Sequence, residues 1–152
     1  MSVFKLNEIP LYNADYEDAA RPATVIALRD AIEASDGIVV CSPEYNHGIP
    51  GVLKNALDWA SRPALESPLK AKPTLIMTSS HLHTGGARAQ HQIRETLSAA
   101  LCRVVSRSEV VIADSNHKVK DDRLVDDAAL SSALEAIDDL LQEIRLVGQD
   151  SR

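Results

Sequence analysis

The chain has 152 residues and a formal charge of −6 at pH 7, and 45% of its residues are hydrophobic and 25% charged. These values predict one globular domain over residues 1–152 with a sizeable core. Only 3% of the residues are aromatic. Together with the negative charge, this argues against a nucleic-acid partner, which needs a basic face with exposed aromatic side chains. The sequence shows neither a long apolar run nor a signal-peptide pattern, so we expect no membrane partner and a cytoplasmic location.

Strands and helices are predicted to alternate along the chain. The elements expected in the first part are a short strand at 3–6, a polar connection at 8–22, a helix at 24–35, a strand at 37–42 and a helix at 50–61. The first of these helices places Val25, Leu28 and Ile32 on one face. The strand GIVVCS is apolar without alternation, which is typical of a parallel strand covered on both faces.

The same alternation continues in the second part of the chain. The elements expected there are a proline-containing loop at 62–73, a strand at 74–80, a helix at 87–102, a strand at 109–113 and a helix at 126–147. The last helix is amphipathic, and its apolar side consists of Leu130, Leu134, Ile137, Leu141 and Ile144. The charged segment KVKDDRLVDD before this helix predicts a solvated loop.

This alternation predicts an α/β fold with a parallel sheet and helices on both faces. Such sheets bind ligands at the carboxyl ends of their strands. Two predicted strands end in turns with more polar and glycine residues than a simple reversal requires, SPEYNHGIPG and SSHLHTGGAR. These two turns are therefore the candidate site.

The first turn has features of a ligand-binding loop. Pro43 restricts Ser42 to extended geometry and so directs the chain out of the sheet. The backbone N–H groups of residues 44–46 are expected to lack sheet partners, and at the amino end of a helix they suit an electron-rich or anionic ligand. Gly48 and Gly51 let the backbone come close to a ligand. An ordinary helix start would also suit these residues.

The amino-acid sequence of the first turn and the helix after it also resembles that of a known family. SPEYNHGIPGVLKNALDWAS closely resembles the signature of the NADPH-dependent FMN reductase family, which includes bacterial chromate and quinone reductases. The similarity runs on through KPTLIMTSS, GGARAQHQIRETL and DDRLVDD, so that it covers residues 3 to about 147. It implies a flavodoxin-like sandwich of three layers, with strand order 2-1-3-4-5 and FMN at the switch point.

The resemblance also implies a cofactor site and a reaction. In this family the PEYN loop lies along the flavin ring and contacts it largely through backbone groups. The implied cofactor-binding residues are Pro43, Glu44, Tyr45, Asn46, His47, Gly48, Ser79, Gly85 and Gly86. NADPH or NADH would pass hydride to the flavin, which would then reduce a quinone, a metal oxyanion or free flavin. Backbone donors would stabilise the negative charge on the reduced ring, so no catalytic side chain is nominated.

The sequence departs from the family in two places. The family begins with a strand, a phosphate-binding loop and a helix, and we expect this unit to be absent here, so that FMN binds weakly and mainly through its ring. A fragment of a longer protein would show the same departure. An open sheet edge would also favour a homodimer or homotetramer, with Trp59 as an anchor in an interface formed by 50–61 and 62–73. Trp59 could instead pack inside its own subunit. The second departure is Leu82, which stands where relatives usually carry glycine and could crowd the ring.

Cysteines and histidines complete the candidate residues. Cys41 and Cys102 are predicted to be buried, reduced thiols. His81 and His83, with His47 facing them, suggest a metal site or solvated loop histidines, and we nominate no metal ligand. A second class of function also stays open, a flavodoxin-like module that has lost FMN and acts as a structural or interaction protein.

Overall fold

The computed structural model describes residues 1–17 and 20–150. The helices are η1 (Ala14–Tyr16), α1 (Ala23–Glu33), α2 (Gly51–Ala60), α3 (Ala87–Ala99), α4 (Ser115–Lys118) and α5 (Asp127–Asp150). The strands are β1 (Ile38–Pro43), β2 (Pro73–Ser79), β3 (Arg103–Val104), β4 (Val110–Ile112), β5 (Val119–Lys120) and β6 (Arg123–Leu124). All the predicted helices and all the predicted strands but the first are present, with small shifts of their ends.

Proline and glycine mark the amino ends of three helices. Pro22 and Pro50 precede α1 and α2 with φ near −60°, the value that the proline ring imposes. Gly86 precedes α3 with φ 92°, a conformation that favours glycine. The local sequence therefore sets where these helices begin.

The main sheet is parallel and β2 is its central strand. β1 pairs with β2 along its full length, from Ile38 beside Thr74 to Pro43 beside Ser79. On the other side, β2 pairs with β3 at its start and with β4 at its end. The predicted parallel sheet is confirmed, and β1 lies at one edge of it.

The far side of β2 holds two short strands, although one strand at 109–113 was predicted. The chain leaves β2 after β3 and returns as β4. Gln90 of α3 fills the interruption, because its amide nitrogen donates to the carbonyl oxygens of Ile76 (3.2 Å) and Val110 (3.0 Å). Its side chain is almost fully buried, so it satisfies backbone groups that a continuous strand would have paired.

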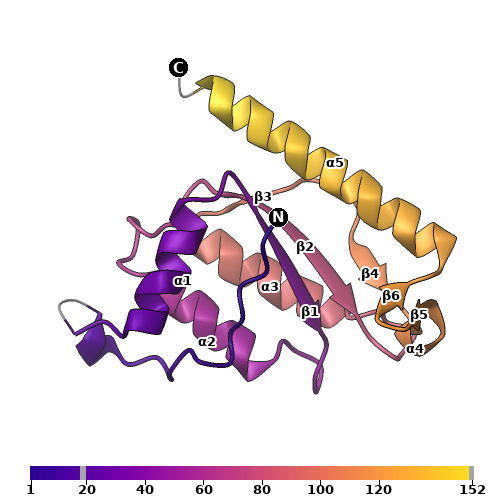
Figure 1. The fold of residues 1–152 in the computed structure, drawn as a ribbon, viewed down its shortest axis with the longest axis horizontal. Helices are drawn as coiled ribbons and strands as arrows, with labels where there is room; N and C mark the ends of the chain where they lie inside the picture. Colours follow the sequence, from indigo (N-terminus) through magenta and orange to yellow (C-terminus); the bar gives the residue numbers. More distant parts are fainter. Residues whose placement is uncertain (18–19, 151–152) are drawn as a thin grey trace.

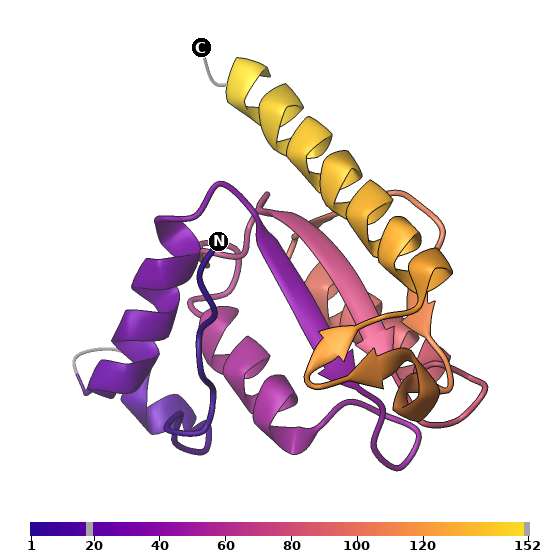
Figure 2. The same cartoon turned by 45° about the vertical axis from the view of Figure 1, so that its right-hand side comes forward.

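Helices cover both faces of the sheet (Figure 1). The helices α1, α2 and α3 lie on one face, and α5 crosses the other, as the turned view also shows (Figure 2). The core is divided accordingly, because Ile76 packs with the first three helices and its neighbour Leu75 packs with Ala136 and Leu140 of α5. Adjacent residues of β2 thus enter opposite layers, as the alternation of a strand requires.

Trp59 of α2 is fully buried within its own chain. Its Nε1 donates to the carbonyl oxygen of Pro10 (2.8 Å), and its ring meets Tyr12 edge to face at 5.0 Å. Asn55, one turn earlier, accepts a hydrogen bond from the N–H of Tyr12 (2.8 Å). The prediction of Trp59 as an interface anchor was wrong, because the connection after residue 8 folds back over this side of α2.

Two other predictions were also wrong about local structure. Residues 1–6 form no strand, and within the described residues β1 pairs with β2 alone. The charged segment before α5 contains the antiparallel hairpin β5–β6, whose turn residues Asp121 and Asp122 both have positive φ. The hairpin is largely exposed, as the charges led us to expect.

The two cysteines differ in exposure. Cys41 of β1 is exposed, contrary to the prediction. Cys102 is half-buried, and burial raises its pKa to about 11. Among the residues that the structure describes, no helix is long and apolar enough to cross a membrane.

Candidate active site

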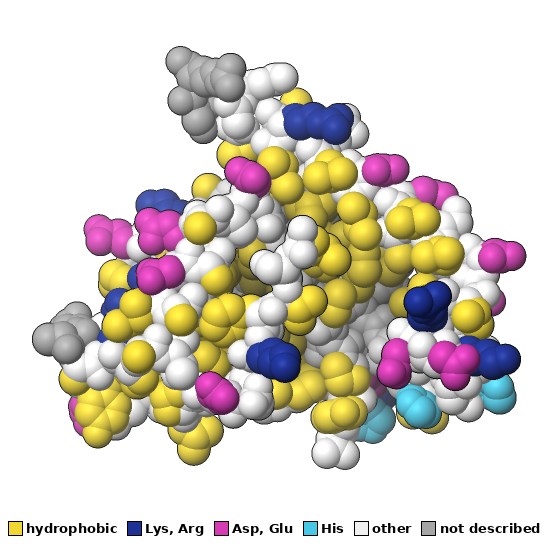
Figure 3. Space-filling view, in the orientation of Figure 1, with side chains coloured by type: hydrophobic (Ala, Val, Ile, Leu, Met, Phe, Trp, Pro, Cys, Tyr) yellow, Lys and Arg dark blue, Asp and Glu magenta, His cyan; other side chains and the backbone are white. Residues whose placement is uncertain are grey.

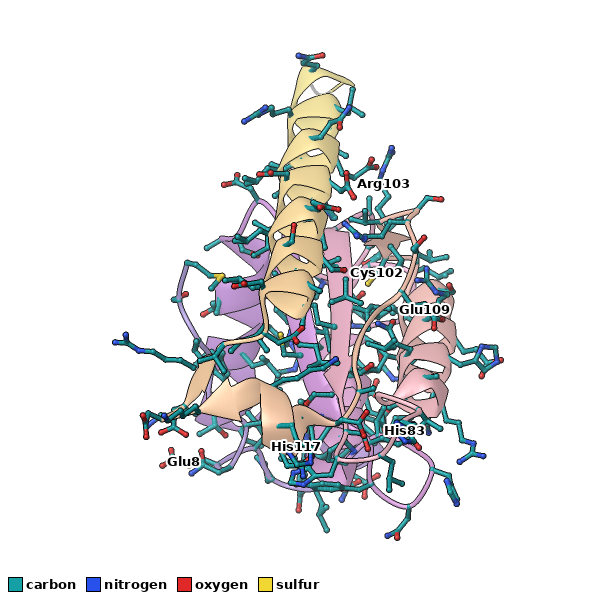
Figure 4. All side chains as sticks on the ribbon, turned by 90° about the vertical axis from the view of Figure 1, so that its right-hand side faces the viewer. Glu8, His83, Cys102, Arg103, Glu109 and His117 are labelled. Atoms are coloured by element: carbon teal, nitrogen blue, oxygen red, sulfur yellow. The ribbon has the colours of Figure 1, made fainter. Side chains whose placement is uncertain are left out.

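The two predicted turns lie side by side at the carboxyl edge of the sheet. Pro43, the last residue of β1, is the register partner of Ser79, the last residue of β2. The turns that follow them leave the sheet at the same point. Figure 4 shows His83 and His117 at this end of the molecule, whereas Cys102 and Arg103 lie toward the opposite end.

The first turn is a tight two-residue reversal. Tyr45 and Gly48 exchange backbone hydrogen bonds of 2.9 and 3.0 Å, and the residues between them, Asn46 and His47, both have positive φ. Two central residues with positive φ are the mark of a type I′ turn. Glu44 also has a partner, since its N–H donates to the carbonyl of Ser79 (3.3 Å). The prediction that residues 44–46 all lack partners was therefore wrong for the first two.

Only the tip of this turn presents free donors. Within residues 1–17 and 20–150, the N–H groups of Asn46 and His47 have no hydrogen-bond partner. They are adjacent, and they follow Tyr45, whose side chain is 62% exposed. The turn therefore offers two neighbouring backbone donors to whatever binds beside it.

The carboxylate of Glu44 reaches the first helical turn of α3. It accepts hydrogen bonds from the backbone N–H groups of Arg88 (3.0 Å) and Ala89 (3.3 Å), at the amino end of that helix. The side chain is only 5% exposed, and its other oxygen lies 3.9 Å from the guanidinium of Arg88. Glu44 thus caps α3 and holds the first turn against it, a role that favours an acidic side chain because of the helix dipole.

A second side chain connects α3 to the same turn from the other direction. The Oε1 atom of Gln92 accepts a hydrogen bond from the N–H of Ile49 (2.8 Å). A Cβ atom at Gly48 would lie 2.7 Å from this oxygen. Gly48 therefore serves close packing against α3, and the first turn is held at both ends by one helix.

The second turn is positioned by backbone contacts. A Cβ at Gly86 would lie 2.8 Å from the Cβ of Thr78, and one at Gly85 would lie 3.0 Å from the Cβ of Val111. These glycines pack the turn onto β2 and the end of β4. The loop after β4 supports it further, because the N–H of Ser115 donates to the carbonyl of Ser80 (3.0 Å).

A cleft of about 320 Å³ lies between the turns, a volume within the range of small-molecule sites. Its walls are Pro43, Glu44, Tyr45, Ser79, Ser80, His81, Leu82 and Ser115. Four of the nominated residues line it, Asn46 lies at the tip of the first turn and is not among its walls, and Gly85 and Gly86 pack the second turn onto the strands. Sequence reasoning included Ser80 in the second turn without nominating it as a binding residue, and it missed Ser115. The polar run ADSNH after the last strand could have indicated Ser115, because it leaves the sheet at the same edge.

The remaining nominated residues face another groove. His47 and Gly48, together with Ala87, Arg88, His91 and Gln92 of the α3 region, line an open groove of about 680 Å³ on the other side of the first turn. Arg88 donates to the ring nitrogen of His47 there. The first turn therefore separates two surfaces, the cleft and this groove.

The histidines do not come together. His81 lines the cleft, whereas the Nδ1 atom of His83 lies 2.8 Å from a carboxylate oxygen of Asp114. His47 is held by Arg88 across the first turn. In the part of the chain that the structure describes, no three His, Cys, Asp or Glu side chains are arranged to hold a metal ion.

The sequence model of the family described as NADPH-dependent FMN reductase matches residues 1–117. The chain belongs to this family. It is 38% identical to the quinone reductase of Escherichia coli K12 over 145 residues, which cover 91% of this chain and 77% of that protein. It is 39% identical to an NAD(P)H-dependent FMN reductase of Pseudomonas aeruginosa over 142 residues, with 93% and 74% covered.

A solved structure supports the same assignment. FerB, a flavoenzyme NAD(P)H:(acceptor) oxidoreductase from Paracoccus denitrificans, matches with a TM-score of 0.80 at 30% identity, covering 92% of this chain and 77% of FerB. The flavodoxin-like fold predicted from the motif is therefore confirmed. Family membership makes the chain an NAD(P)H-dependent flavin oxidoreductase with FMN as its cofactor.

The residues present fit the ring of FMN better than its phosphate. The first turn, which forms one wall of the cleft, carries two free backbone donors at its tip, and small polar side chains line the cleft, which suits the edge of a flavin. No lysine or arginine lines it. The amino end of α3, which would otherwise attract an anion, is already occupied by the Glu44 carboxylate. Within the described residues we find no phosphate cradle at this cleft.

Proposed function

We propose that the cleft between the two turns holds the isoalloxazine ring of FMN and that the chain uses NAD(P)H to reduce small acceptors of the quinone class. Bound FMN supplies the hydride-accepting chemistry. The N–H groups of Asn46 and His47 face the ring edge on which negative charge develops. Tyr45 and Leu82, 62% and 63% exposed, flank the mouth and limit the access of water.

One observation carries this proposal. The reversal at residues 45–48 leaves two adjacent N–H donors without a protein partner beside a cleft of suitable volume. These donors belong to the backbone, and α3 holds their turn at both ends through Glu44 and Gln92. They are therefore in place before reduction, so they need not reorganise when charge appears on the ring.

Ring-centred binding is tested by titrating the protein with FMN and with riboflavin, following the quenching of flavin fluorescence. We expect similar affinities, because the cleft offers nothing to the phosphate. Oxidation of NADPH with benzoquinone should then rise with added FMN and saturate. A large preference for FMN would contradict ring-centred binding. Failure to bind either flavin would overturn the proposal and favour the module that has lost its cofactor.

The role of the backbone donors has its own test. In the double variant Asn46→Gly and His47→Gly both side chains are removed, but both N–H groups and the positive φ angles are kept. Flavin affinity should stay at the wild-type value. A large loss would assign binding to the side chains instead, while the quinone reductase activity itself could survive.

We also propose that the protein is a homodimer or homotetramer and that it works in the cytoplasm, where reduced nicotinamide nucleotides are available. Burial of Trp59 removes the anchor expected for the interface, but Val52 of α2 and Leu65 of the following loop are 46% and 67% exposed. Apolar side chains at these positions suit association. Sedimentation over a dilution series measures the assembly, and a monomer at all concentrations would rule it out.

A further inference from the structure

His81, in the second turn, lines the cleft, and its side chain has no bonding partner. The ring makes neither a hydrogen bond nor an ion pair with any residue that the structure describes. The residue is also exposed to solvent. Both ring nitrogens are therefore available to a molecule bound in the cleft and to water.

The other histidines of the two turns are already engaged. The Nδ1 atom of His83 lies 2.8 Å from a carboxylate oxygen of Asp114. His47 accepts a hydrogen bond from Arg88 on the side of the open groove. Histidine side chains gather at the surface at this end of the molecule, near α4 and the hairpin β5–β6 (Figure 3). Of these three histidines of the turns, His81 alone combines a place in the cleft wall with unbonded ring nitrogens.

The other side chains in the walls of the cleft are poor proton donors near neutral pH. The Glu44 carboxylate accepts hydrogen bonds from two backbone N–H groups of α3. The hydroxyls of tyrosine and serine hold their protons in this range, whereas the charge of histidine changes between about pH 5 and 8. Among the residues that line the cleft, His81 is also the only one able to carry a positive charge.

Reduction of a quinone consumes a proton as well as a hydride. The hydride brings both electrons and one hydrogen, and its addition leaves an oxyanion on the acceptor. A proton on that oxygen completes the hydroquinone, so that NAD(P)H, quinone and one proton give NAD(P)⁺ and hydroquinone. An acid placed beside the oxyanion accelerates this step.

We propose that His81 is the proton donor to acceptors of the quinone class, an inference that rests on the proposed function. Its imidazolium donates a hydrogen bond to the acceptor oxygen, and the proton moves to that oxygen as the hydride arrives. The N–H bond breaks, the O–H bond forms and the imidazole becomes neutral. Because His81 is exposed, water returns the proton. The site is therefore suited to acceptors whose reduction takes up a proton.

The charged and titratable groups around His81 come from three segments. They are Glu44 and Tyr45 of the first turn, His83 of the second turn, and Asp114, His117 and Lys118 of the segment after β4. The two carboxylates among them already have partners, Glu44 at the amino end of α3 and Asp114 at His83. The pH dependence of proton donation should therefore follow the titration of His81 itself.

His81→Gln tests the proton, because the amide keeps an N–H donor but has no proton to give. The kcat/KM for duroquinone, whose fully substituted ring does not alkylate cysteine, should fall about a hundredfold. The wild-type value should fall as pH rises through the titration of His81, and the value for the variant should stay level. His83→Gln is the matched control, and it should keep the wild-type value and pH profile.

A second acceptor separates proton transfer from the supply of hydride. Hexaammineruthenium(III) takes up electrons but no proton, so its reduction by NADPH should be equal in the wild type and in His81→Gln. A wild-type protein that reduces neither acceptor would contradict the proposed function. A protein that reduces both acceptors at rates independent of residue 81 would contradict only the role of His81.

NMR titration of the histidine rings gives a readout without turnover. The wild-type protein loaded with riboflavin is titrated with and without saturating para-nitrophenolate, which mimics the oxyanion. The titration midpoint of His81 should rise by about one pH unit, because a charge-assisted hydrogen bond favours the imidazolium. The midpoint of His83 should not move.

Two results would overturn the proposal. An unchanged midpoint of His81 with the nitrophenolate bound would mean that its ring does not meet the acceptor oxygen. An equal loss of activity with duroquinone and hexaammineruthenium(III) in His81→Gln would mean that the histidine supports the site without giving a proton. Riboflavin titration of the variant shows whether such a loss comes from weaker binding of the ring.

Discussion

The two turns that form the cleft are held in place by different means. Substitutions in them are therefore expected to affect the stability of the fold and the binding of ligand differently. The first turn is connected to α3 by the side chains of Glu44 and Gln92. The second turn depends on glycines that pack directly against strand residues. We therefore expect changes at the glycines of the second turn to damage the fold, and changes around the first turn to alter how well its free donors are held.

The largest effect is expected at Gly86, in the second turn. Its φ of 92° and a Cβ position 2.8 Å from Thr78 leave no room for a side chain. Gly86→Ala should lower the free energy of unfolding by about 3 kcal/mol, combining backbone strain with a clash in the core. Gly51→Ala is the matched control, because a Cβ there meets nothing within 4 Å and alanine favours the helix. Urea denaturation measures the free energy of unfolding of both variants. A similar loss in both would mean that close packing at Gly86 does not set the effect of the substitution.

The next largest effect concerns Glu44. Glu44→Ala removes the cap of α3 and leaves two N–H groups without partners, which should cost about 2 kcal/mol. It should also weaken flavin binding, because the first turn is no longer held against α3. Glu95→Ala, at an exposed position of the same helix, serves as the control.

Glu44→Gln separates the charge from the hydrogen bonds. The amide oxygen can still accept from Arg88 and Ala89, so most of the stability should return, while the favourable interaction of the carboxylate with the helix dipole is lost. If Glu44→Ala lowered stability without changing flavin affinity, the cap would be structural only.

A smaller effect is expected at Gly48, and it sharpens the comparison of the two turns. The atom nearest to a Cβ at Gly48 is the amide oxygen of Gln92, at 2.7 Å, which is the end of a flexible side chain. Gly48→Ala should therefore cost only about 1 kcal/mol, the value of the lost hydrogen bond to Ile49.

The pair Gly48 and Gln92 is suited to a double-mutant cycle. Gln92→Ala alone should cost a similar amount, and the double variant should cost no more than either single change, since both remove the same bond. Additive costs in urea denaturation would mean that the alanine meets something other than Gln92.

The parts of the fold that could be predicted are those with a local signal. The apolar runs of β1 and β2 and the proline or glycine before α1, α2 and α3 are visible in a few consecutive residues. β4 was predicted as the strand at 109–113, whereas β3 could not be predicted, because a two-residue strand exists only through pairing with β2. Residues 3–6 carry a strand pattern but pair with no strand, which shows that propensity is overridden when no partner is beside it.

The candidate site shows the same division. Pro43, Tyr45 and Ser79, which the motif nominated, line one cleft, since the carboxyl ends of adjacent parallel strands meet. The motif could not show that Glu44 faces α3, because that contact joins residues 44 apart in the sequence.

The smallest effect on stability is expected at Leu82, where the second turn meets the cleft. Its side chain lines the cleft and is 63% exposed, so Leu82→Ala should change the free energy of unfolding by no more than about 0.5 kcal/mol. Flavin affinity should nevertheless rise, because removing the side chain opens the cleft to the ring while the donors of the first turn stay in place. The control is Leu65→Ala, at a leucine of similar exposure outside the cleft. Titration with riboflavin measures the effect without a contribution from the phosphate. Weaker binding in Leu82→Ala would mean that the leucine packs on the ring and is a favourable part of the site, which would reverse the expectation that it crowds the flavin.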